Sequence, residues 1–174
     1  MEITIIKPKI YTLKLVPTKD DEEYGLCTYV RFIFDCDNGR LTINGDLGDY
    51  SYEWGFNKNE DFMHLMSRID QSYLLSKLAN RNIFNLEESK IETIKSIELS
   101  DLYYELEEDW TNIKNEILRC YTEYDESFYR KIESLIPSID FETIRLEYDY
   151  PKSAQVACLL FTKYIQPYIK TNFQ

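Results

Sequence analysis

The sequence predicts an α+β protein, in which an N-terminal antiparallel β-meander of three to four strands is packed by short helices and followed by a helical C-terminal part. Two observations support this prediction. Apolar and polar residues alternate with a period of two through the first third of the 174-residue chain, which is typical of half-buried strands. Further along, apolar residues recur at i, i+3, i+4 and i+7, the spacing of one helix face. The chain therefore changes from sheet to helix.

The strands are expected to follow one another through short turns. The first, from Glu2 to Val16, is interrupted by Pro8, which favours a sheet edge or a break between two short strands. The strand with the clearest alternation of side chains is predicted from Leu26 to Cys36. Its buried face is predicted to carry Leu26, Val30, Phe32, Phe34 and Cys36. Further strands are expected at 40–44 and 49–54, after glycine-containing turns at 37–39 and 45–48.

Helices are predicted for most of the remaining chain. Asn59 is expected to cap the first, and Asn85 to cap another through Ile97, because Glu88 follows Asn85 by three residues. The longest helix is predicted from Ser100 to Tyr124. Shorter or later helices are expected at 73–78, 125–136 and 152–170, whereas 140–150 fits either a helical turn or an extended segment.

Two parts are expected within one fold. Residues 1–79 would form the antiparallel sheet with two covering helices, and residues 80–174 the helical part, continuous with the same core as a single domain or a closely packed two-part domain. The length of 174 residues suits one domain. The polar segment 80–82 marks the internal boundary.

The charge balance indicates which partners the protein avoids. The formal net charge is −11, from 31 acidic and 20 basic side chains, and this charge repels phosphate backbones. Direct nucleic-acid binding is therefore not expected. An acidic protein is steered instead toward basic surfaces, including the nucleic-acid channels of other proteins. No apolar run is long enough to cross a membrane, and the first residues do not resemble a secretory signal.

No catalytic, nucleotide-binding or cofactor-binding motif is present, so we expect a protein that is not an enzyme and needs no cofactor. The single histidine, His64, has no second ligand at metal-binding spacing on its helix. Asp46 and Asp49 flank the second turn. These two carboxylates leave open an alternative, a metal-dependent hydrolase or nuclease-like enzyme.

Acidic side chains are the candidate partner-binding residues. On one uninterrupted helix, Asp101, Glu105, Glu108, Asp109 and Glu116 would collect on one face beside the apolar seam and form an acidic ridge. The residues predicted to bind a partner are Asp101, Glu105, Glu108 and Asp109, with the loop residues Asp20, Asp21, Glu22 and Glu23 as a second set.

A family resemblance involves the joint between sheet and helices. The order Gly45-Asp46-x-Gly48-x-Tyr50-Ser51-Tyr52-x-Trp54, then Phe62, then Asp70-x-x-Tyr73-Leu74-Leu75-x-Lys77-Leu78 resembles a group of small proteins encoded by phages and prophages. Leu47 departs from the tyrosine or tryptophan that these proteins tend to have there. The resemblance covers about a fifth of the chain and carries no catalytic residue.

The resemblance implies a phage accessory protein acting in the cytoplasm of a bacterial host. Small acidic proteins of this kind often disable host defences by binding, and anti-CRISPR proteins are one example. We therefore expect the chain to bind and inhibit a host defence effector with a basic nucleic-acid channel, its acidic side chains substituting for phosphates. A phage structural component is a further alternative.

Overall fold

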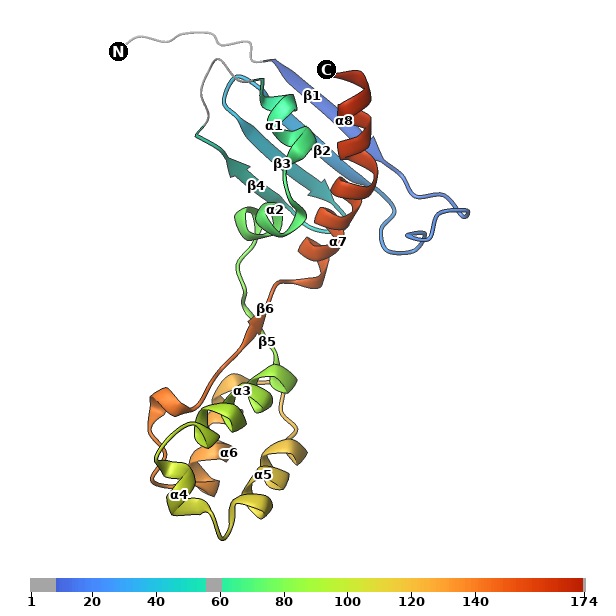
Figure 1. The fold of residues 1–174 in the computed structure, drawn as a ribbon. Coiled ribbons are helices and arrows are strands. Elements are labelled where there is room, and N and C mark those ends of the chain that lie inside the picture. The colour runs from blue at the N-terminus through green and yellow to red at the C-terminus, as the bar shows by residue number, and fades with distance from the viewer. Residues whose placement is uncertain (1–8, 56–60, 174) are drawn as a thin grey trace, which may run out of the picture. The chain divides into compact units, whose positions relative to one another are not determined.

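The computed structural model describes residues 9–55 and 61–173 and contains two compact units, each with its own apolar core (Figure 1). Residues 1–80 and 150–174 form the first, which we call the sheet unit. Residues 81–149 form the second, the helical unit. In sequence, the helical unit is thus inserted into the sheet unit, and residues 150–173, which were predicted to belong to the helical part, pack with the sheet.

The sheet unit contains the predicted antiparallel meander. Its strands are β1 (Ile10–Leu15), β2 (Val30–Asp35), β3 (Arg40–Gly45) and β4 (Tyr50–Glu53), hydrogen-bonded in that order. On β2, Val30, Phe32 and Phe34 are fully buried, as their alternation predicted. The strand begins only at Val30, however, and Leu26 lies in the preceding loop with 48% of its surface exposed.

Helices cover one face of this sheet (Figure 1). They are α1 (Phe62–Arg68), α2 (Gln71–Leu78), α7 (Lys152–Leu160), a π-helical turn (Phe161–Ile165) and α8 (Gln166–Asn172). The last three form the continuous helix predicted at 152–170. Phe161 packs on Phe32 with ring centroids 5.8 Å apart. Asp61 caps α1 through a bond from the Met63 amide, whereas the predicted cap Asn59 lies outside the described residues.

The helical unit begins and ends in a short antiparallel pair. Its elements are β5 (Ile83–Phe84), α3 (Leu86–Glu98), α4 (Leu102–Leu106), α5 (Trp110–Arg119), α6 (Asp125–Leu135), a 3-10 turn (Phe141–Thr143) and β6 (Tyr148–Asp149). Asn85 caps α3 by accepting a bond from the Glu88 amide, as predicted. The open segment 140–150 contains both predicted forms, a helical turn followed by an extended strand.

The prediction of one helix from Ser100 to Tyr124 is wrong. The chain turns at 107–109 between α4 and α5, and after Arg119 it becomes extended at Cys120 (Figure 1). Three successive carboxylates occupy the first break, and no Lys or Arg lies within four residues to offset their repulsion. At the second break, aromatic and β-branched residues disfavour helix. The apolar spacing persists across both breaks because α4 and α5 still pack on one core.

Candidate protein-binding site

The break between α4 and α5 determines where the predicted acidic residues lie. Asp101 precedes α4, Glu105 lies on α4, and Glu108 and Asp109 lie in the turn, so they do not form a ridge along one helix. All four are exposed. Sequence reasoning missed Glu107, since an uninterrupted helix would point it about 100° away from Glu108. We call Asp101, Glu105, Glu107, Glu108 and Asp109 the acidic tract.

The carboxylates of the acidic tract have no side-chain hydrogen bond or ion pair within the described residues. Neighbouring carboxylates do have partners: Glu98 accepts bonds from the Lys114 ammonium (2.8 Å) and the Trp110 indole (3.2 Å), and the bond from Lys114, followed by that from Trp110, lowers its pKa. Glu92 and Glu126 also pair with basic residues on their own helices. No Lys or Arg occurs between Lys95 and Lys114. The tract is therefore a concentration of uncompensated negative charge.

The two units differ strongly in charge. The helical unit has 18 acidic and 8 basic side chains, a formal net charge of −10, whereas the sheet unit has 13 and 12, a net charge of −1. Nearly all of the net charge of −11 thus belongs to 69 residues. Within this unit, α4 and the turn into α5 lie at the end far from β5 and β6 (Figure 1).

Exposed apolar side chains accompany the acidic tract. Leu99 is 89% exposed and Tyr104 is 76% exposed. On α4, the ring of Tyr103 packs edge-on against the ring of Trp110, with centroids 5.9 Å apart. This contact attaches α4 to the core of the helical unit. Aromatic residues are enriched at protein interfaces, whose rim is polar. The tract and these two side chains form the candidate protein-binding site.

The second predicted set of acidic residues is largely used inside the sheet unit. Asp21 accepts bonds from the Thr18 amide (2.6 Å) and hydroxyl (2.9 Å). Glu22 binds the Lys163 ammonium at 2.9 Å. Glu23 is only 5% exposed and accepts bonds from Lys163, at 2.6 Å, and from the Tyr164 hydroxyl. This loop is therefore attached to the π-helical turn, which sequence spacing could not indicate across 140 residues.

We expect Glu23→Gln to lower the melting temperature of the sheet unit above about pH 5. The hydrogen bond from Lys163 and then that from Tyr164 lower the pKa of Glu23 from its ordinary value of 4.5. A carboxyl whose pKa is lower in the folded state stabilises that state above its unfolded pKa, and this contribution is lost as the pH falls through the folded pKa. The difference between wild type and variant should therefore shrink below about pH 4.

The measurement is thermal unfolding followed by Trp54 emission between pH 3 and 7. The background is Trp110→Phe, because the chain has only two tryptophans, Trp54 in the sheet unit and Trp110 in the helical unit. Glu22→Gln is the matched control and should have a smaller effect, since Glu22 is exposed. An equal melting-temperature difference between wild type and Glu23→Gln at pH 3 and pH 7 would contradict the ion-pair explanation.

Asp46, from the enzyme alternative, has a structural contact. Its carboxylate accepts a hydrogen bond from the Thr28 amide at 2.6 Å, and bonds from Thr28 lower its pKa. This bond connects the chain just before β2 to the turn between β3 and β4. Asp46 and Asp49 are both exposed. Among the described residues, no group of three or more His, Cys, Asp or Glu side chains is placed to hold a metal ion, and His64 is exposed on α1.

The described part of the chain has no helix with both the length and the apolarity that a membrane crossing requires.

Comparison with known proteins identifies the family. The family model Phage_phiTE_072, described as a phage family, matches residues 4–171 and so spans both units. No curated protein and no solved structure matches the chain. The match supports the phage origin that the resemblance implied. The chain belongs to the phage family Phage_phiTE_072.

Proposed function

We propose that this protein is a phage accessory factor that binds and inhibits a host defence effector through the acidic tract. One observation carries the proposal: five exposed carboxylates without an ion pair among the described residues gather around α4, on the unit that holds −10 of the −11 net charge. A surface of this kind attracts basic surfaces and repels acidic ones. The partner is expected to be a nucleic-acid-binding protein with a basic channel, in the cytoplasm of the bacterial host.

The carboxylates would substitute for the phosphates of the effector's nucleic acid. Lys and Arg side chains that line such a channel form charge-assisted hydrogen bonds with carboxylates as they do with phosphates. The tract would increase the association rate, and the exposed Tyr104 and Leu99 would supply the apolar contact that most binding energy requires. Anti-CRISPR proteins act in this general way. The proposed role is binding without catalysis or a cofactor.

The test replaces Asp101, Glu105, Glu108 and Asp109 with Lys. The tagged wild-type protein is expected to capture a nucleic-acid-binding host protein from lysate and to inhibit that protein on its own nucleic-acid substrate. Both binding and inhibition should weaken roughly 100-fold in the variant, which requires the loss of only two close charge pairs of about 1.5 kcal/mol each. Added nucleic acid should compete with the wild-type protein, and the affinity should fall with salt.

A matched control separates the tract from net charge. Four other exposed acids of the helical unit, Glu123, Glu133, Asp140 and Glu142, are replaced with Lys, which changes the charge by the same amount. This control should retain most of the inhibition, and both variants should keep the wild-type circular-dichroism melt. Equal inhibition by the tract variant and the wild type would remove phosphate substitution as the mechanism.

A further inference from the structure

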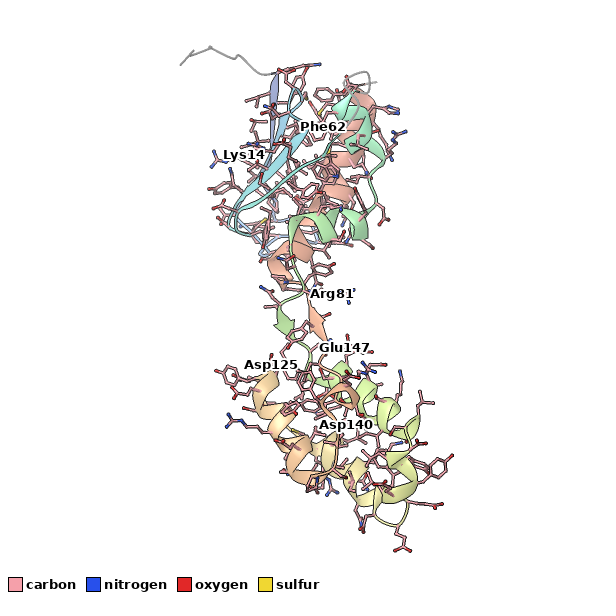
Figure 2. The ribbon with its side chains drawn as sticks, turned by 90° about the vertical axis from the view of Figure 1, so that its left-hand side faces the viewer. Lys14, Phe62, Arg81, Asp125, Asp140 and Glu147 are labelled. Atoms are coloured by element: carbon pink, nitrogen blue, oxygen red, sulfur yellow. The ribbon has the colours of Figure 1, made fainter. Side chains whose placement is uncertain are left out.

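Among the described residues of the sheet unit, no helix covers one face of the sheet. The helices of the sheet unit all pack on the face that carries Phe32, and the other face presents alternate residues of each strand (Figure 1). On that open face, Lys14 of β1 lies directly opposite Arg31 of β2. Figure 2 shows Lys14 on the side of the sheet away from the helices. Two like charges directly opposite each other destabilise a sheet, so their juxtaposition requires an explanation.

Both cations lie over one tyrosine ring. The Lys14 ammonium is 5.1 Å from the centroid of Tyr29, and the Arg31 guanidinium carbon is 5.5 Å from it. Within the described residues, neither pairs with a carboxylate. On the same face, by contrast, Arg40 forms an ion pair with Glu53. The ring therefore holds two cations whose charge is free to attract an anion.

Two further residues extend this site. Asn44 of β3 lies opposite Arg31, and its buried side-chain oxygen has no hydrogen-bond partner among the described residues. Val16 directly follows β1, two residues after Lys14, and is 51% exposed, so an exposed apolar side chain lies at this end of the strand. We call Lys14, Val16, Tyr29, Arg31 and Asn44 the basic sheet patch. It combines positive charge, an aromatic face, an exposed apolar group and an amide oxygen that can accept a hydrogen bond from a donor such as a tyrosine hydroxyl.

We propose that the basic sheet patch binds the acidic tract of a second copy of this chain. The two surfaces are complementary in charge: within the part of the chain that the structure describes, the two cations of the patch pair with no carboxylate and the five carboxylates of the tract pair with no cation. Each surface also carries exposed apolar side chains, Val16 on one side and Tyr104 and Leu99 on the other. Two different surfaces meet in such a contact, so association is head-to-tail and produces rings or short chains.

Sedimentation velocity on the full chain tests the proposal. At about 50 mM salt the mean mass should rise with concentration between roughly 10 and 500 µM, and at about 500 mM salt it should stay close to 20.9 kDa, because salt screens charge pairs. The double variant K14E/R31E should remain monomeric at both salt concentrations. A variant of the acidic tract, D101K/E105K/E108K/D109K, should also remain monomeric. A mixture of these two variants should form a complex, because the reversed charges again match.

The matched control is K152E/K170E, which changes the charge by the same amount on α7 and α8, over the other face of the sheet. Lys152 and Lys170 are exposed, and this control should associate like the wild type. Monomers throughout, or association that K14E/R31E leaves unchanged, would overturn the proposal. Binding of a labelled single-stranded oligonucleotide to wild type but not to K14E/R31E would also overturn the proposal, because the basic sheet patch would then be a nucleic-acid-binding site.

The result is separable from the proposed inhibitory function. K14E/R31E removes the basic sheet patch and leaves the acidic tract intact, so capture of a host effector should persist in this variant. If self-association and effector binding share the tract, the unassembled protein should capture the effector better than the assembled one. Comparing the amount of effector captured by K14E/R31E and by wild type at high protein concentration therefore measures how far self-association competes with effector binding.

Discussion

Replacing Phe32 with alanine is expected to lower the free energy of unfolding of the sheet unit by about 3–5 kcal/mol. Phe32 is fully buried on β2, between β1 and β3, and its ring packs against Phe161 of the π-helical turn. Truncation removes the transfer energy of the ring and leaves a cavity in close-packed surroundings. This loss is a large fraction of the total stability of a small unit.

The two tryptophans allow the effect to be assigned to one unit. Trp54 lies in the core of the sheet unit and Trp110 in that of the helical unit. In a Trp110→Phe background the Trp54 transition should shift to lower denaturant, and in a Trp54→Phe background the Trp110 transition should stay in place. Ile33→Ala, next in sequence on the open face, is the control and should cost about 1 kcal/mol. A shift of the Trp110 transition would show that the two cores unfold together.

Excising residues 81–149 and joining Asn80 to Tyr150 through a short Gly-Ser linker should leave a folded sheet unit. The core of this unit contains no residue between 79 and 155, and the ends of the excised segment are paired as β5 and β6. Asn82 donates a backbone hydrogen bond to Asp149 at 3.0 Å, so a short linker spans the gap. Insertions at positions whose ends lie close together are tolerated with little loss of stability.

The excised protein should retain a cooperative Trp54 transition within about 1 kcal/mol of the full chain. Its formal charge should change from −11 to −1, which anion-exchange elution detects. Residues 81–149 alone should keep a helical circular-dichroism spectrum and, under the proposed function, the capacity to capture the effector. Loss of the Trp54 transition on excision would mean that the sheet unit depends on the helical unit.

The prediction from sequence succeeded where a local pattern is sufficient. Alternation of Val30, Phe32 and Phe34 predicted both the strand and its buried face, because side chains on a strand point to opposite sides in turn. Asn85 predicted its helix cap, because the hydrogen bond spans only three residues. The four acidic residues predicted on the helical part are exposed, whereas Glu23 of the second set is buried. The arrangement of those four was not predicted correctly, since the three consecutive carboxylates at 107–109 interrupt a helix whose apolar spacing continues across the break.

By itself, the sequence determined the fold class, the faces of the central strand, the excess of negative charge and the likeness to phage proteins. Only the tertiary structure decided that residues 150–172 return to cover the sheet, that Glu23 is buried against Lys163, and that nearly all the net charge lies on an inserted unit. The physical reason is that these features depend on contacts between residues distant in sequence. Side-chain periodicity reports which face is buried but not which element covers it.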